Sequence, residues 1–194
     1  MPTINIYWLI GFIEGDGSFS LTKSGATLSI GQKYVNMITL RAIELFLNNL
    51  PNSYGITIDS QKPNPRSGIN KNTHVIVMHW SNFDSLFDYI LPILQAHLDF
   101  FHSRKKIDFI LWSTVVSLNK TGLIYTQEGK ILLEKLSTNF NQRRYSNSNI
   151  TSPIKLVTQD EINQVLSLPP LWDLNSDLSH VKLVMKNLSF IRRK

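Results

Sequence analysis

The hydrophobic pattern changes from a helical period to strict alternation near residue 17, which predicts a helix that runs directly into a β-hairpin. Over residues 6–16 apolar side chains recur at helical spacing. The stripe consists of Trp8, Leu9, Phe12 and Ile13. Residues 18–22 and 26–30 then alternate between polar and apolar types, and Ser24-Gly25 supplies the turn between these two strands.

A second helix and a second pair of strands follow the hairpin. Helical spacing returns over residues 35–50, and it predicts the following buried face: Val35, Ile38, Ala42, Leu45 and Phe46. Strands are expected at residues 55–59 and 73–80, with the polar loop 62–72 between them. The predicted order is therefore helix, strand, strand, helix, followed by a second pair of strands.

Three further helices are expected over residues 83–91, 103–118 and 126–139, the last capped by residues 126–129. The order α-β-β-α-β-β-α predicts an α+β fold in which helices cover one face of a four-stranded antiparallel sheet. Residues 145–153 are rich in Ser and Asn and are interpreted as a linker. We therefore expect one domain over residues 1–144 and a C-terminal extension over 145–194.

The extension is expected to hold short helices only. One is predicted at residues 158–166, before a break at Pro169-Pro170, and a last one lies between residues 177 and 187.

The charge of the chain favours a polyanionic partner. The chain has 194 residues, a net charge of +6 and a pI near 9.6. Residues 1–100 carry 6 basic and 7 acidic groups, so the basic excess belongs to the second half. This excess of basic residues either lies on helix faces exposed to solvent or forms a surface that binds the phosphates of a nucleic-acid backbone. The absence of cysteine excludes disulfides and thiol nucleophiles, and no apolar run approaches the roughly 18 residues of a membrane span, so no membrane partner is expected.

Two carboxylates stand at the unfavourable end of the first predicted helix. Glu14 and Asp16 lie where the helix dipole is negative, which disfavours acidic side chains by up to about 1 kcal/mol. A cation nearby would relieve this, and carboxylate oxygens suit Mg²⁺ or Ca²⁺. Gly11 and Gly15 share one helix face and permit close contact with another helix. An ordinary amphipathic helix with an acidic last turn is the alternative interpretation.

The same residues form a longer pattern. The run is Leu9-Ile10-Gly11-Phe12-Ile13-Glu14-Gly15-Asp16-Gly17. It resembles the signature of the LAGLIDADG homing endonucleases, with both glycines and both acids in register. Residues 28–33, and residues 126–129 with Asn141 and Arg143, are also similar to that family. The resemblance covers residues 6–144 and implies the same α+β fold.

In that family two signature helices pair, and their acids meet at the base of a saddle of two sheets that straddles the DNA major groove. The resemblance implies metal-dependent hydrolysis of double-stranded DNA, with Mg²⁺ or another divalent cation as cofactor. Asp16 would be the essential metal ligand, and Glu14 would contribute mainly through its backbone carbonyl or helix packing. Gln32 matches a catalytic polar position, and either Lys105 or Lys106 matches the basic one.

The polar face of the strands would then contact nucleic acid, since a two-stranded ribbon can enter the major groove. The predicted contact residues are Ser18, Ser20, Thr22, Thr27, Ser29, Lys33, Thr57, Asp59, Gln61, Arg66, Arg143 and Arg144. Taken singly, each of the strand residues is also explained as part of a solvated strand face.

One active centre of this kind needs two signature helices, and the chain has one. A working nuclease is therefore expected to be a homodimer, or to join a partner chain, through Gly11 and Gly15. The alternative is a non-catalytic protein of the same fold that binds structured RNA, as an intron maturase or a component of an organellar ribonucleoprotein such as the ribosome.

Location is indicated only by composition and by the start of the chain. The frequent Asn, Ile, Lys and Phe are typical of an AT-rich organellar genome. No Arg-rich amphipathic leader precedes the first helix. We expect a mitochondrial or chloroplast protein that is made inside the organelle, unless residues are missing from this start.

Overall fold

The computed structural model describes residues 3–22, 25–50, 58–61, 75–80, 84–140 and 156–175. The chain forms two compact units, Met1–Trp112 and Ser113–Lys194. We call them unit 1 and unit 2 and describe each by itself.

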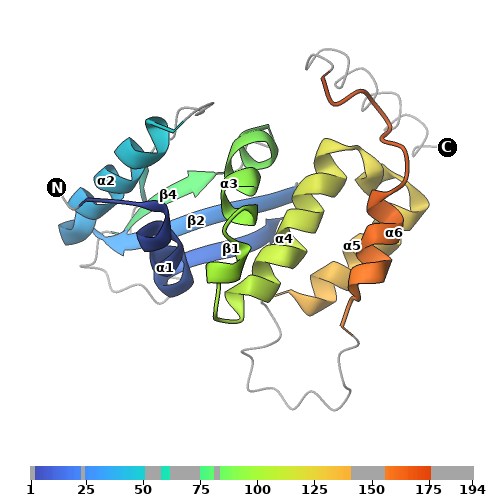
Figure 1. The fold of residues 1–194 in the computed structure, drawn as a ribbon, viewed down its shortest axis with the longest axis horizontal. Helices are drawn as coiled ribbons and strands as arrows, with labels where there is room; N and C mark the ends of the chain where they lie inside the picture. The colour runs from blue at the N-terminus through green and yellow to red at the C-terminus, as the bar shows by residue number, and fades with distance from the viewer. Residues whose placement is uncertain are drawn as a thin grey trace. The chain divides into compact units, whose positions relative to one another are not determined.

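Unit 1 is built on a four-stranded antiparallel sheet with the strand order β1-β2-β4-β3 (Figure 1). The strands are β1 (Gly17–Thr22), β2 (Gly25–Lys33), β3 (Ile58–Gln61) and β4 (Val75–Trp80). Thr22 pairs with Gly25, so the predicted hairpin is confirmed. The second predicted pair is confirmed at residues 58–59 and 75–80, and β3 extends two residues beyond the predicted end, to Gln61. The remaining parts of the predicted ranges lie outside the described residues.

Helices cover one face of this sheet in unit 1 (Figure 1). They are α1 (Ile6–Asp16), a 3₁₀ turn (Tyr34–Asn36), α2 (Met37–Asn48), a π-helical segment (Ser85–Ile90) that continues into α3 (Leu91–Gln95), and a 3₁₀ turn (Leu98–Phe100). The long helix α4 (Lys105–Lys120) begins in unit 1. The α+β class predicted from the sequence is confirmed.

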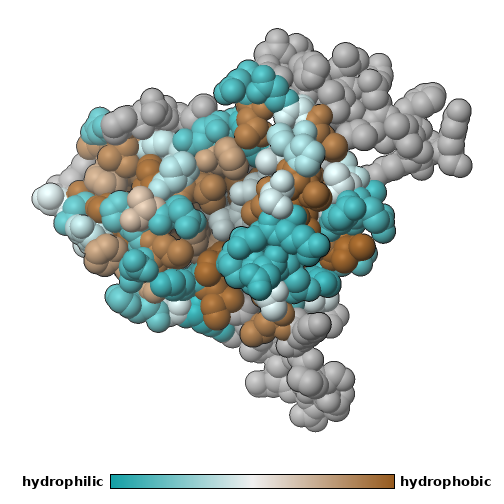
Figure 2. All heavy atoms as spheres, turned by 45° about the vertical axis from the view of Figure 1, so that its right-hand side comes forward, coloured by the Kyte–Doolittle hydropathy of each residue, from teal (hydrophilic) through white to brown (hydrophobic). Residues whose placement is uncertain are grey.

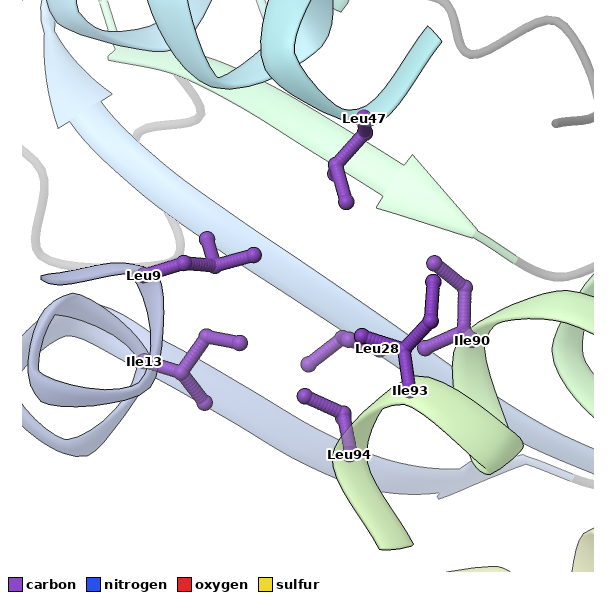
Figure 3. A pocket seen from close by; sticks show the side chains of 7 residues that line it. All are labelled: Leu9, Ile13, Leu28, Leu47, Ile90, Ile93 and Leu94. Carbon is purple, nitrogen blue, oxygen red and sulfur yellow. The ribbon is translucent and has the colours of Figure 1, made fainter. Parts of the chain in front are cut away.

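Apolar side chains from the sheet and three helices form the core of unit 1. A small apolar pocket lies among residues of α1, β2, α2 and the π-helix–α3 segment, and Figure 3 shows their side chains converging on it. The lining residues are Leu9, Ile13, Leu28, Leu47, Ile90, Ile93 and Leu94. Beside them, Phe19 contacts the rings of Phe101, Phe109 and Trp112, and the Trp112 indole donates to the carbonyl of Thr27 at 2.9 Å.

The predicted apolar face of α2 is correct only in part. Ala42 is buried and Phe46 is half-buried, but Val35, Ile38 and Leu45 are 81%, 55% and 54% exposed. The remaining buried residues of this helix are Leu40, Ile43 and Leu47. Val35 lies in the 3₁₀ turn, where each residue rotates the chain by more than in an α-helix, so the helical phase starts again at Met37. Figure 2 shows apolar residues lying among hydrophilic ones on the visible surface.

Unit 2 consists of the end of α4, a 3₁₀ turn (Leu123–Tyr125), α5 (Gln127–Asn139) and α6 (Gln159–Leu166). The predicted helices at 126–139 and 158–166 are confirmed, and the Thr126 hydroxyl caps α5 by accepting from the Gly129 N–H. Trp172 packs on Gly122 and donates to the Lys120 carbonyl at 2.8 Å.

A capping box formed by Thr158 and Glu161 starts α6. The Lys135 ammonium, with the Thr158 N–H, lowers the pKa of Glu161 to about 2.

The expected linker at 145–153 and the expected last helix within 177–187 lie outside the described residues. Among the helices that are described, none has the length and apolar character needed to cross a bilayer.

Candidate functional site

The exposed carboxylate of Asp16 stands at the junction of α1 and β1. Asp16 is the last residue of α1, and Gly17 begins the strand. Gln32, near the end of β2, donates from Nε2 to Asp16 Oδ2 at 2.6 Å. Asn36 in turn donates from Nδ2 to Gln32 Oε1 at 2.8 Å. The structure thus brings Asp16 and Gln32 together, as the sequence predicted, and adds Asn36, which the sequence reasoning missed.

The carboxylate of Glu14 is used inside the chain. Its Oε1 accepts from the backbone N–H groups of His102 and Ser103 at 2.8 and 2.7 Å, just before the first turn of α4. Burial would raise the pKa of Glu14, but these N–H groups offset it and hold the pKa below its ordinary value. Metal ligation by Glu14 stays a prediction, and Oε1 already has two donors.

Lys105, in the first turn of α4, caps the C-terminal end of α1. Its Nζ donates to the Ile13 carbonyl at 2.9 Å, to the Gly15 carbonyl at 3.5 Å and to the Gly17 carbonyl. Burial lowers the pKa of this ammonium, and the charges of Asp16, Asp108 and Glu14 oppose that shift.

Lys106 lies elsewhere: its Nζ is 3.6 Å from Asp99 Oδ1, whose side chain is 99% exposed. The structure therefore places Lys105, and not Lys106, at the end of α1.

Helix dipoles explain why these contacts form. The last carbonyls of α1 carry negative partial charge and the first N–H groups of α4 carry positive partial charge. Lys105 supplies a cation to the carbonyls, and the Glu14 anion lies near the N-terminal end of α4, where it accepts from the N–H groups of His102 and Ser103 just before the helix. Of the two acids at the end of α1, Glu14 is compensated by backbone donors within the chain, while Asp16 is exposed to solvent beside Gln32 and Lys105.

The polar face of the hairpin lies next to Asp16. Ser18 pairs with Ser29 and Ser20 pairs with Thr27 across the two strands, and the Oγ atoms of Ser18 and Ser20 are 3.2 Å apart. Ser18, Ser20 and Ser29 are half-buried, whereas Thr27 is only 8% exposed and offers little surface to a partner.

The remaining predicted contact positions are spread more widely. Lys33, at the end of β2, is exposed and pairs in register with Val75. Asp59 and Gln61 lie opposite Val77 and Val75, so the alternation of the strands puts these two positions on the same face as Ser29 and Lys33. Thr22 closes the hairpin in register with Gly25. Four predicted residues lie outside the described part of the chain: Thr57, Arg66, Arg143 and Arg144.

The glycine face of α1 is open. Leu9, Ile10 and Ile13 are buried, whereas Gly11 and Gly15 are exposed, and a Cβ at either glycine would meet no atom within 4 Å. The sequence grouped Trp8 and Phe12 with the buried stripe, but their rings are half-buried and stack on each other at 4.8 Å. The helix thus packs on the core by one side, and no described part of the chain covers its two glycines.

Comparisons with known proteins agree with this architecture. No family model matches the chain. It is 28% identical over 208 residues to the uncharacterized mitochondrial protein RF1 of Saccharomyces cerevisiae, an alignment that covers 95% of this chain and 41% of the yeast protein.

Solved structures of homing endonucleases share the fold at low sequence identity. I-LtrWI, a LAGLIDADG homing endonuclease bound to target DNA, superposes with a TM-score of 0.59 and 18% identity over 73% of this chain and 46% of its own. I-SmaMI bound to cleaved DNA superposes with a TM-score of 0.57 and 18% identity, over 90% of this chain and 53% of I-SmaMI. I-TnaI superposes with a TM-score of 0.55 and 15% identity, over 85% of this chain and 97% of I-TnaI.

The chain spans about half the length of I-SmaMI and I-LtrWI and less than half of the yeast protein, whereas it matches nearly all of I-TnaI. The TM-scores of 0.55 to 0.59 show that the overall fold agrees with these structures. The chain therefore has the fold of the LAGLIDADG homing endonucleases, to which its sequence resemblance in α1 had pointed.

Proposed function

We propose that this protein binds nucleic acid on the sheet of unit 1 and hydrolyses double-stranded DNA when α1 pairs with a second signature helix. The observation that carries the proposal is the exposed Asp16 carboxylate, which Gln32 orients at the end of α1 beside the polar strand face. I-LtrWI and I-SmaMI, which share the fold, were solved bound to DNA, and this supports DNA as the ligand.

The residues at this position fit half of a divalent cation site. Asp16 offers a carboxylate at the negative end of a helix, and Mg²⁺ prefers such oxygen ligands together with substrate phosphates. Within the described residues no three His, Asp or Glu side chains gather as ligands. A second signature helix and the DNA backbone would therefore supply the rest, and I-SmaMI has been solved on uncleaved DNA in the presence of calcium ions.

Each residue at the site has a distinct role in this proposal. A divalent cation held by Asp16 would lower the pKa of an attacking water and stabilise charge on the leaving oxygen. Gln32 fixes the Asp16 carboxylate through Oδ2, and Lys105 holds the end of α1 and places a positive charge beside it. Ser18, Ser20 and Ser29 present hydroxyl groups on the strand face toward base edges and phosphates.

Pairing through the open glycine face completes the site. Gly11 and Gly15 let the backbones of two helices approach closely, and the second helix comes from another copy of the chain or from a different chain. A mitochondrial location is proposed because the yeast relative is a mitochondrial protein.

The described residues of unit 2 carry more acidic than basic groups. The basic residues are Lys120, Lys130 and Lys135, and the acidic residues are Glu128, Glu134, Asp160, Glu161 and Asp173. Lys135 is also paired with Glu161 at 2.6 Å. The described part of unit 2 therefore does not offer a basic surface to phosphates, and the proposed nucleic-acid surface is the sheet of unit 1.

The proposal is tested by exposing the full chain to a randomised double-stranded DNA library with Mg²⁺. We expect cleavage at a roughly palindromic site if the protein forms homodimers. Asp16→Asn should abolish cleavage but not binding, because it removes the carboxylate charge and keeps the shape. Asp99→Asn is the matched control, since it removes an equal charge from a 99% exposed side chain, and it should cleave normally.

Two outcomes would contradict the proposal. The intact protein could bind the library and cut no member of it, alone or with native partner chains. Crosslinking in native extract could instead recover one dominant RNA, which would favour the RNA-binding alternative.

A further inference from the structure

Asn36 occupies a position where asparagine normally caps a helix, yet it does not cap α2. It is the residue before Met37, and Asn is among the best N-cap residues because its side-chain oxygen accepts from the first free N–H groups. In this structure its side chain makes no capping bond. Its amide instead donates to Gln32 Oε1 at 2.8 Å. The Asn36 side chain thus donates to Gln32 and does not cap α2.

Asp16 and Asn36 together fix which end of the Gln32 amide faces Asp16. A glutamine amide has an oxygen that accepts and a nitrogen that donates, and the two ends have nearly the same shape. The Asp16 carboxylate can only accept, so it favours the nitrogen on its side, and Asn36 Nδ2 reinforces this orientation by donating to the Gln32 oxygen on the other side. The Gln32 nitrogen is then turned to Asp16 Oδ2, 2.6 Å away.

We propose that Asn36 is a positioning residue: it fixes the Gln32 amide so that the nitrogen donates to Asp16 Oδ2. The role rests on the proposed function, in which Asp16 is the metal ligand. With its oxygen held by Asn36, Gln32 acts at the site as a donor that fixes the carboxylate. Second-sphere contacts of this kind, removed in other metalloenzymes, typically cost about 10- to 100-fold in metal affinity or activity.

Asn36→Asp tests this without a change of size. An aspartate at residue 36 cannot donate to the Gln32 oxygen, but it accepts from the Gln32 nitrogen, so the Gln32 amide should turn over and leave Asp16. Asp is as good an N-cap as Asn and suits the positive end of α2, so the variant should be at least as stable as the wild type. Asn175→Asp, an exposed position in unit 2, is the control for the added charge.

The first readout is independent of nuclease activity. The side-chain NH₂ signals of Gln32 are followed by NMR in the full chain and assigned by their loss in Gln32→Glu. In the wild type and in Asn175→Asp, Asp16→Ala should shift these signals, because it removes the acceptor of the Gln32 nitrogen. In Asn36→Asp, Asp16→Ala should leave them unchanged. An equal response in all backgrounds would overturn the proposal, whether or not the protein cleaves DNA.

The second readout is the cleavage rate on the DNA site selected from the library, measured at saturating DNA. We expect Asn36→Asp to cleave about 10- to 100-fold more slowly with unchanged DNA affinity, and Asn175→Asp to cleave at the wild-type rate. If Asn36→Asp releases Gln32 from Asp16 and still cleaves at the wild-type rate, the positioning role is wrong. If Asn36→Asp weakens DNA binding and leaves Gln32 in place, Asn36 contacts DNA directly and the proposal also fails.

Discussion

Two acids two positions apart, Glu14 and Asp16 with Gly15 between them, have different environments at the end of α1. Glu14 faces the backbone N–H groups of His102 and Ser103, and these donors favour its ionised form. Asp16 has an exposed carboxylate and a side-chain donor, Gln32. The energetic cost of an acid at this end of a helix is thus offset for Glu14 by two backbone N–H groups just before α4, whereas the Asp16 carboxylate stays exposed beside Gln32 and Lys105.

Glu14→Gln tests the charge of this contact, since an amide oxygen can still accept from both N–H groups. The folded-state pKa of Glu14 is lowered, so its contribution is present above the unfolded value of 4.5 and is lost as pH falls through the folded pKa. At neutral pH we expect the variant to lose about 1 kcal/mol of unfolding free energy, the value for a charged hydrogen bond reduced for partial exposure. Urea unfolding at several pH values measures it.

The difference between Glu14→Gln and the wild type should shrink as the pH falls below 4.5. Glu134→Gln on α5, an exposed position, serves as the control and should change the unfolding free energy little at any of these pH values. A difference that stays constant down to acid pH would mean that the charge of Glu14 has no part in the contact.

The sequence predicted which residues meet at the end of α1 better than it predicted what each one does. Asp16 and Gln32 could be matched because the signature and the hairpin register both place them. Lys105 could not be separated from Lys106, because the choice depends on the rotation of α4 about its axis. The role of Asn36 depends on a side-chain amide orientation, which residue spacing does not encode.

At the scale of elements, α1 has two faces with different requirements. The face with Leu9 and Ile13 packs on the sheet, and a Cβ at Gly11 or Gly15 would meet no atom of the described residues within 4 Å. A glycine inside a helix costs about 0.5–1 kcal/mol relative to alanine. Two such glycines on an open face gain nothing from packing against the described residues, and they fit the proposed pairing with another helix.

Gly11→Ala should consequently stabilise the isolated chain while it weakens pairing. We expect about 0.5–1 kcal/mol more unfolding free energy, because the added Cβ meets no atom within 4 Å, and a shift toward monomer in sedimentation equilibrium. Gly17→Ala is the contrasting variant, since its Cβ would lie 2.7 Å from the Ile13 carbonyl oxygen, and it should destabilise the chain. Unchanged association in Gly11→Ala would show that α1 is not the pairing helix.

The elements that sequence patterns predicted best are those with one apolar face. The hairpin alternates strictly, and α6 begins with a capping box, so both were placed within a few residues. In α2 apolar residues occur on more than one side, and the spacing alone could not tell Leu40, Ile43 and Leu47 from the exposed set. The 3₁₀ turn before α2 decided the phase, and its sequence carries no strong signal.

At the scale of the whole molecule, the boundary between units falls inside α4. The sequence predicted a domain over residues 1–144, which stays a prediction, while the structure divides into units at residues 112 and 113. Composition marks Ser- and Asn-rich linkers, but a boundary inside a continuous helix leaves no such mark. Unit 2 has its own buried residues, among them Leu132, Leu136, Ile162 and Trp172, so it has a core that can be disturbed by itself.

Gly122→Ala should unfold unit 2 selectively. Gly122 has a φ of +76°, and a Cβ there would lie 2.7 Å from the indole ring of Trp172, so the substitution adds left-handed strain and displaces a buried aromatic ring. We expect a loss of about 2–4 kcal/mol, because overpacking costs about 1–3 kcal/mol and the strained φ about 1 kcal/mol more. Hydrogen exchange should then speed up in α5 and α6 and stay unchanged in β1 and β2. Equal acceleration in both sets of elements would show that the two units unfold as one, and unchanged exchange in α5 would show that Trp172 does not hold unit 2 together.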